Sequence, residues 1–249
     1  MHIPDAVAAL ERDLRAIFGH RLQSMVVYGL RAQAVRHDAH GARAAHGADH
    51  AAALTHTLAV VDGLSTDDLR ACTGHVQHWQ DSGLDTPLLI TTHEFGRSLD
   101  VFPFEFGTIL ADHELVSGSD PFDGLGVEPA DERRACEVQA RGHLLHLREG
   151  YLETRGRSDA LAVLIVESAP AFAALVTSVA HLDAVAAPDA AAAARHVERR
   201  LELTSGTAAA IVALVGVREI SSSEAVRLFA PYLDLVERLV TYIDRWTPR

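Results

Sequence analysis

The sequence predicts an α+β protein in which a mixed-sheet half precedes an all-α helical bundle. Short apolar runs bounded by Gly, Pro and Asp, which are typical of buried strands, occur in the first half of the chain. From about residue 129 onward, apolar residues recur at spacings of three and four, the periodicity of helices packed in a bundle. We place the boundary in a loop rich in Gly, Ser and Asp, so that residues 1–126 form the first domain and residues 127–249 the second.

The first half begins with an amphipathic helix over residues 4–20, in which Pro4 lies near the first turn. A capping-box pattern, Ser65 to Asp68, predicts a second helix that runs to about Asp81. Pro103 places the last extended segment at a sheet edge or bulge. We predict four extended segments, over residues 22–30, 58–61, 87–92 and 100–110.

The second half contains a long helical pattern from about Pro129 and a final helix after the Ser221–Ser223 cap. Its most apolar stretch, residues 160–187, includes the polar or helix-breaking residues Glu167, Pro170, His181 and Asp183. A bilayer centre would penalise these residues. We therefore interpret this stretch as buried helices and expect no membrane partner.

Composition narrows the function classes. A net charge of −12 argues against binding extended nucleic acid, which requires a basic surface. All 22 basic residues are Arg, which excludes Schiff-base chemistry on Lys and a P-loop lysine. Cys72 and Cys136 have no zinc-site spacing and indicate a reducing compartment. The N-terminus lacks the pattern of a signal peptide, so we expect a cytoplasmic location.

Four segments carry a resemblance to a known family: VVYGL (26–30), LAVVDGL (58–64), SLDVFPFEF (98–106) and LLHLREGYL (144–152). Together with the order of elements, they resemble the nucleotidyltransferase superfamily, and within it the bacterial antibiotic-type and minimal enzymes with a helical C-terminal domain. The resemblance implies a first strand that runs into Gly-Ser and cradles a triphosphate. It also implies an Asp-x-Asp pair on a second strand, which holds Mg²⁺, and a third carboxylate on a later strand.

The sequence departs from this pattern at both motifs. Gly29 is followed by Leu30 rather than Ser, and Thr55 and Thr57 flank His56 where the family has Asp-x-Asp. Neutral hydroxyls lack the charge that holds Mg²⁺ against water. The resemblance therefore implies a degenerate site without metal ligands, in which the nucleotide-binding candidates are Gly29, Leu30, Arg31, Thr55 and Thr57.

A third carboxylate is the surviving part of the pattern, and Glu105 and Asp100 are its candidates as catalytic residues on the extended segment 100–110. Phe104 and Phe106 flank Glu105, which predicts partial burial and a raised pKa if their side chains cover it. The alternative is a charge on an edge strand that faces water. In the helical half, Arg141 is a candidate for nucleotide binding, because related helical domains turn the corresponding helix towards the cleft.

The histidines are interpreted as structural or solvated. The Ala- and His-rich stretch 31–53 is either a metal site or a solvated low-complexity loop, and its irregular spacing favours the loop. The pairs His75/His78 and His143/His146 are predicted to lie on helix surfaces.

Three functional hypotheses remain open. The first is a catalytically degenerate nucleotidyltransferase-fold protein that binds a nucleotide, a small ligand or a protein partner. The second is an active transferase with non-standard ligands, which would need Mg²⁺ as its cofactor. The third is an interaction module whose Ala-rich bundle forms a homodimer.

Overall fold

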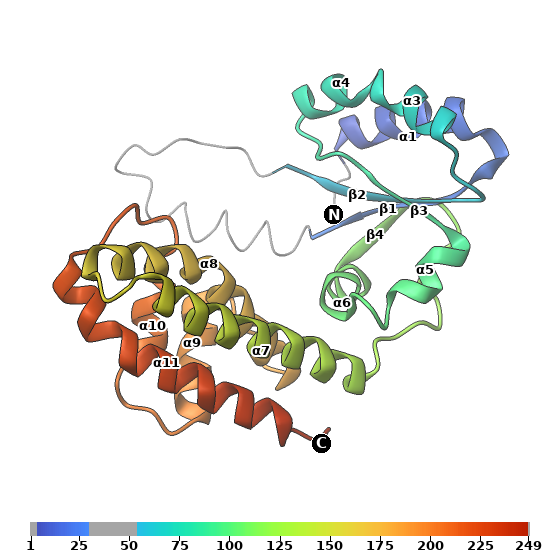
Figure 1. Cartoon of the computed structure of the whole chain (residues 1–249). Helices are drawn as coiled ribbons and strands as arrows, with labels where there is room; N and C mark the ends of the chain where they lie inside the picture. Colours follow the sequence, from blue (N-terminus) through green and yellow to red (C-terminus); the bar gives the residue numbers. More distant parts are fainter. Residues whose placement is uncertain (1–3, 30–53, 249) are drawn as a thin grey trace. The chain divides into compact units, whose positions relative to one another are not determined.

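The computed structural model describes residues 4–29 and 54–248, and it confirms the α+β class (Figure 1). The chain divides into two compact units, Met1–Val127 and Glu128–Arg249. In the described residues the first unit contains a mixed sheet with helices on both faces, and the second contains helices alone.

The sheet of the first unit has four described strands in the order β3-β2-β1-β4. β1 pairs antiparallel with β2 and with β4, and β2 pairs parallel with β3. β1 is central, and its residues 24–27 are all buried, as expected for a strand covered on both faces. The strands span Leu22–Tyr28 (β1), His56–Val61 (β2), Leu88–Thr91 (β3) and His113–Gly118 (β4).

Helices cover the two faces of the sheet (Figure 1). One face packs against α1 (Asp5–Phe18), α3 (Thr66–Thr73) and α4 (Val76–Asp81). A short 3-10 turn (Gly19–Arg21) connects α1 to β1. The other face packs against α5 (Thr92–Ser98) and α6 (Pro103–Ala111). Alternate residues of β1 enter the two cores, since Met25 and Val27 belong to the first and Val26 belongs to the second.

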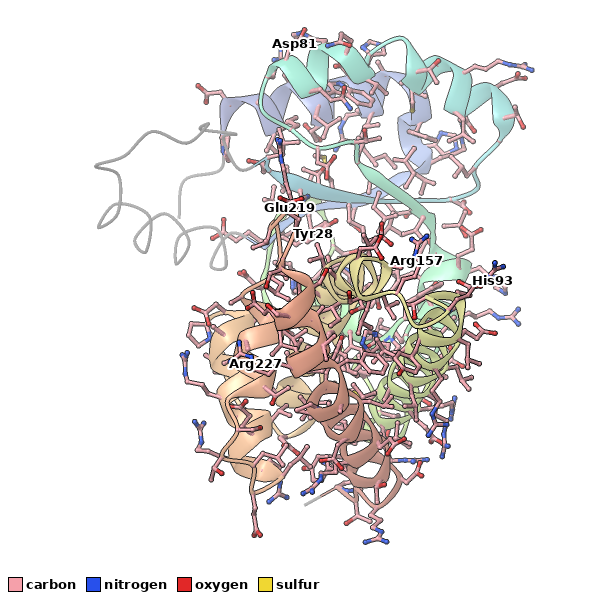
Figure 2. The ribbon with its side chains drawn as sticks, turned by 60° about the vertical axis from the view of Figure 1, so that its left-hand side comes forward. Tyr28, Asp81, His93, Arg157, Glu219 and Arg227 are labelled. Carbon is pink, nitrogen blue, oxygen red and sulfur yellow. The ribbon has the colours of Figure 1, made fainter. Side chains whose placement is uncertain are left out.

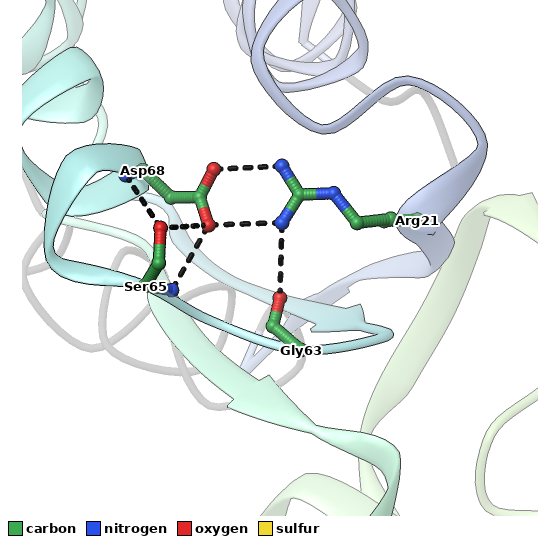
Figure 3. Close-up of polar contacts among 4 residues, drawn as sticks. All are labelled: Arg21, Gly63, Ser65 and Asp68. Atoms are coloured by element: carbon green, nitrogen blue, oxygen red, sulfur yellow. Dashed lines mark hydrogen bonds and ion pairs between the residues drawn. The ribbon is translucent and has the colours of Figure 1, made fainter.

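A polar cluster of Arg21, Gly63, Ser65 and Asp68 fixes the turn between β2 and α3 (Figure 3). The predicted capping box is confirmed, because Ser65 Oγ accepts from the Asp68 amide at 3.2 Å and Asp68 accepts from the Ser65 amide at 2.9 Å. Arg21, just before β1, donates to both carboxylate oxygens of Asp68, at 2.7 and 2.9 Å. This bidentate pair, together with Ser65, holds the pKa of Asp68 well below its usual range. The helix expected to continue to Asp81 breaks at Gly74, a weak helix former.

The prediction of an extended segment over 100–110 is wrong, because most of these residues form the helix α6 (Pro103–Ala111). Pro103 occupies the first turn of that helix, a position where its missing N–H costs nothing. Phe106 and Ile109 then face the second core at helical spacing. The fourth strand is β4, and its last two residues, Ser117 and Gly118, lie in the loop predicted as the domain boundary.

The second unit is a bundle in which α7, α8 and α11 pack against one another and α9 and α10 complete the core. Ser221 caps α11 as predicted, since its Oγ accepts from the Glu224 amide at 3.2 Å. α8 is the one described helix that is long and apolar enough to cross a membrane, and it packs against the four other helices of the bundle. The helices span Pro129–Glu153 (α7), Ser158–Leu182 (α8), Ala190–Arg200 (α9), Thr207–Val212 (α10) and Ser222–Asp244 (α11).

His143 corrects the prediction of a surface histidine. Its ring lies in the bundle core, 8% exposed, with Nε2 2.7 Å from the hydroxyl of Tyr232. The Tyr232 hydroxyl also lies 3.2 Å from Ser168 Oγ, so the three side chains join α7, α8 and α11. Burial lowers the pKa of His143 to about 4. The ring is therefore neutral at pH 7 and serves packing; His146, by contrast, is exposed as expected.

Candidate functional site

The two motif positions lie side by side at one end of the sheet. Tyr28 on β1 pairs with His56 on β2, and Val27 pairs with Thr57. Gly29 follows β1 at a φ of +73°, a conformation that favours glycine, and its amide donates to the Asp112 carbonyl at 2.9 Å. We call Gly29 and residues 55–57 the sheet end. The structure thus brings together the positions at which the resemblance expects the phosphate-cradling turn and the carboxylate pair.

The two threonines of the sheet end have different surroundings. Thr55 is half-buried, and its backbone bonds to Gly83 at 2.9 Å and to Asp85 at 3.0 Å. Thr57 is 1% exposed and lies on the same face of β2 as Ala59, in the core beneath α1. Its Oγ1 has no hydrogen-bond partner among the described residues. Thr57 therefore offers no side-chain atom to a ligand.

The opposite face of the sheet end carries a row of three rings. Tyr28 (labelled in Figure 2) lies on β1 between His56 on β2 and His113 on β4. The rings of Tyr28 and His56 are stacked with centroids 5.6 Å apart. Burial, and then the charge of Asp85, raise the pKa of Tyr28, so the phenol keeps its proton at neutral pH.

Both histidines of this row have a carboxylate partner. His56 Nδ1 lies 3.0 Å from Asp85 Oδ2, which leaves Nε2 as the nitrogen open to a ligand on a side chain that is 42% exposed. His113 donates from Nδ1 to the carbonyls of Ile109 and Leu110, both at 3.1 Å, and its Nε2 lies 3.4 Å from Asp120. The arrangement can stack a planar ligand and hydrogen bond to it. In the described part of the chain no group of three or more His, Cys, Asp or Glu could hold a metal ion.

The remaining predicted residues lie elsewhere. Glu105 is exposed on α6, which excludes the first of its two interpretations, burial between Phe104 and Phe106. The charge faces water, as in the second interpretation, but from a helix that turns Phe106 into the core and Glu105 outward. Asp100 is exposed in the turn before that helix, and neither acid lies on a strand. Leu30 and Arg31 lie outside the described residues. Arg141 belongs to the helical unit, where it pairs with Glu137 at 3.0 Å and Asp244 at 2.6 Å.

A second polar cluster, which sequence reasoning missed, lies in the helical unit. Asp183 follows the last residue of α8, and its carboxylate accepts from side chains of α9 and from the end of α11. His196 Nε2 lies 2.7 Å from Oδ2, and the Tyr242 hydroxyl and Trp246 Nε1 donate to Oδ1 at 2.5 and 3.2 Å. Burial and the bond to Asp183 raise the pKa of Tyr242, which keeps the phenol a donor. Together with Arg200, these residues form what we call the Asp183 cluster.

Comparison with solved structures gives a structural likeness. No protein-family model matches the chain, and no curated protein matches it. Among solved structures, the chain is similar to a crystal structure of spectinomycin adenyltransferase from Enterococcus faecialis with ATP and spectinomycin. The likeness covers 94% of this chain and 98% of that chain, at 12% identity and a TM-score of 0.49. At this level it assigns no activity to the chain.

Some residues of the Asp183 cluster and of the ring row could have been predicted from their spacing in the sequence. His196 and Arg200 are four residues apart and share a face of α9. Tyr242 and Trp246 have the same spacing, although α11 ends between them at Asp244. His113 begins a short segment, HELVSG, that ends in Gly. Asp85 and Asp120 give no such signal, because their partners are fixed by the register of the sheet and by loop geometry rather than by spacing.

Proposed function

We propose that this chain is a nucleotidyltransferase-fold protein that binds a nucleotide at its sheet end without transferring a nucleotidyl group. One observation carries the proposal. Gly29 and residues 55–57 are neighbours at the same end of the sheet, as the two superfamily motifs must be, yet hydroxyls and an imidazole replace the carboxylates. The order of elements, with an α+β unit before a helical bundle, also supports it.

The chemistry of the replaced positions argues against two-metal transfer. Mg²⁺ prefers charged oxygen ligands, and a pair of such ions aligns the attacking and leaving oxygens in nucleotidyl transfer. Thr55 is neutral, and the Thr57 hydroxyl points into the core. The carboxylate beside them, that of Asp85, is engaged by His56. These groups would hold Mg²⁺ weakly.

The same groups suit a planar ligand. The side chain of His56 is 42% exposed and its ring orientation is fixed by Asp85 and by the stack on Tyr28. Stacking of a base on an aromatic ring contributes about 1–3 kcal/mol. His56 Nε2 adds a hydrogen bond to a base or a phosphate. We therefore expect the base to contribute most of the affinity and the metal to contribute little.

Isothermal titration with ATP, CTP, GTP and UTP, each in Mg²⁺ and in EDTA, tests the proposal. We expect at least one nucleotide to bind equally well in both buffers, and His56→Ala to weaken its binding at least tenfold. His93→Ala is the matched control, because His93 is an exposed histidine of the same unit, on α5. Release of pyrophosphate from a Mg-nucleotide, with transfer to any acceptor, would contradict the proposal, as would the absence of nucleotide binding.

A further inference from the structure

The helical unit contains a cavity of about 650 Å³ that the motifs of the sheet do not explain. It is bounded by the beginning of α7, the ends of α8 and α9 and the residues after α11. Its polar lining comes from Glu132, His181, Asp183, His196 and Arg200, and Trp246 contributes an indole ring. A volume of this size suits a small organic molecule rather than a single ion.

The carboxylate of Asp183 is already saturated. Its side chain is 8% exposed, and it accepts from His196, Tyr242 and Trp246, with Arg200 Nε 3.8 Å from Oδ2. A carboxylate with this many donors has little capacity left for a ligand. The acid instead orients the groups around it, as a carboxylate does when it fixes the tautomer and ring position of a histidine.

Arg200 is the group of this cluster that still has donors to offer. Its Nε donates to the Tyr242 hydroxyl at 2.9 Å, and its guanidinium lies over the Tyr242 ring, 5.3 Å from the centroid. In the described residues its two terminal nitrogens have no protein partner, and the side chain is 40% exposed at the cavity. A guanidinium held in this way presents a planar fork that matches the two oxygens of a carboxylate or phosphate.

The second acid of the cavity, Glu132, is paired with a histidine. Glu132 lies at the beginning of α7 with its side chain 17% exposed, and one of its oxygens is 3.0 Å from His181 Nε2. Both acids of the cavity are thus paired, whereas the guanidinium fork is not. The lining also includes apolar side chains, among them Leu182 and Val185, and the Trp246 ring. We propose that this cavity binds a small organic anion, with its carboxylate or phosphate on Arg200 and its apolar body against Trp246.

Fluorescence of the full chain tests this site directly. The chain has two tryptophans, and Trp79 is buried in the other unit at 1% exposure, so Trp246 is the reporter that a ligand in the cavity can quench. Phenyl phosphate and benzoate separate the two anion sources, inorganic phosphate lacks the apolar body, phenol lacks the charge, and benzylamine carries the opposite charge. Trp246→Phe should abolish the signal and so confirm its origin.

We expect saturable quenching by phenyl phosphate, by benzoate or by both, and at least tenfold weaker binding of phenol, benzylamine and inorganic phosphate. Arg200→Gln should weaken binding of the anion at least tenfold, and Arg200→Lys should weaken it by a smaller factor, since it keeps the charge but loses the fork. Arg199→Gln is the matched control, because Arg199 is the exposed neighbour on the same helix and does not line the cavity.

Three results would overturn the inference. They are the absence of quenching by both aromatic anions, binding of phenol or benzylamine as tight as that of the anions, and equal affinities of the Arg200→Gln and Arg199→Gln chains. Circular dichroism of each variant separates lost binding from lost folding, and Arg200→Lys supplies the comparison if Arg200→Gln unfolds. The outcome is independent of the nucleotide titration, since His56 belongs to the other unit.

Discussion

The sheet end and the Asp183 cluster differ in whether their buried polar atoms have hydrogen-bond partners. At the sheet end, Thr57 Oγ1 is buried without a partner, while the ring of His56 is open to solvent. In the Asp183 cluster, one buried carboxylate satisfies donors from two helical segments at once. A buried polar group stabilises a fold only when its partners are present. The comparison therefore predicts that removing the partnered acid destabilises the chain and removing the unpartnered hydroxyl stabilises it.

The largest effect is expected from Asp183→Ala. The substitution leaves the donors of His196, Tyr242 and Trp246 without their shared acceptor, and loss of one side of a buried charged network costs about 3–5 kcal/mol. Urea denaturation followed by circular dichroism measures the change in the helical unit. Asp234→Ala is the control, because Asp234 is exposed and pairs with Arg238 one turn away. Equal unfolding midpoints for the two variants would show that the cluster does not support the bundle.

His143 predicts the second largest effect, through pH. Its pKa is about 4 in the folded chain and near 6.5 when unfolded, so the unfolded state binds the proton first as the pH falls. The neutral ring thus contributes its full stability above pH 6.5 and loses it progressively between pH 6.5 and 4. The loss is about 3 kcal/mol. The free energy of unfolding of the wild type and of His143→Gln, measured across this range, should converge towards acid pH; parallel curves would contradict the assignment.

Most of the fold could be predicted from the sequence, because apolar spacing reports burial directly. Val7, Leu10 and Leu14 define the buried face of α1, and the run from Met25 to Val27 defines the central strand. The segment around Pro103 could not be assigned in this way. Proline breaks a strand and also begins a helix, and the contacts of Phe106 with Phe95 decide between the two.

Less of the candidate site than of the fold could be predicted from the sequence. Gly29, Thr55 and Thr57 were found because a family pattern places functional groups at the ends of the first two strands. Their neighbours, Asp85 and His113, are brought in by pairing between segments distant in sequence, and single-sequence spacing carries no record of that pairing. The same holds for Asp183, whose partners lie 13 and 59–63 residues away.

Thr57→Val tests the unpartnered hydroxyl of the sheet end. The substitution replaces an unpartnered buried hydroxyl by a methyl group of similar shape, and we expect it to stabilise the first unit by roughly 1 kcal/mol. Thr108→Val is the control, because Thr108 Oγ1 donates to the Phe104 carbonyl on an exposed part of α6. Thermal unfolding of both variants gives the difference. A lower midpoint for Thr57→Val would mean that its hydroxyl has a partner in the native chain.

The smallest effect is expected from Glu105→Gln. Glu105 is exposed on α6 rather than on a strand, so the substitution should change the free energy of unfolding by less than about 0.5 kcal/mol. It should also leave nucleotide affinity at the sheet end unchanged, whereas His56→Ala weakens it in the same titration. The two variants separate the two interpretations of the first unit. If Glu105→Gln abolishes binding or a transfer activity, carboxylate chemistry operates in this unit, and the contrast between a ring-lined sheet end and an acid-centred helical cluster no longer holds.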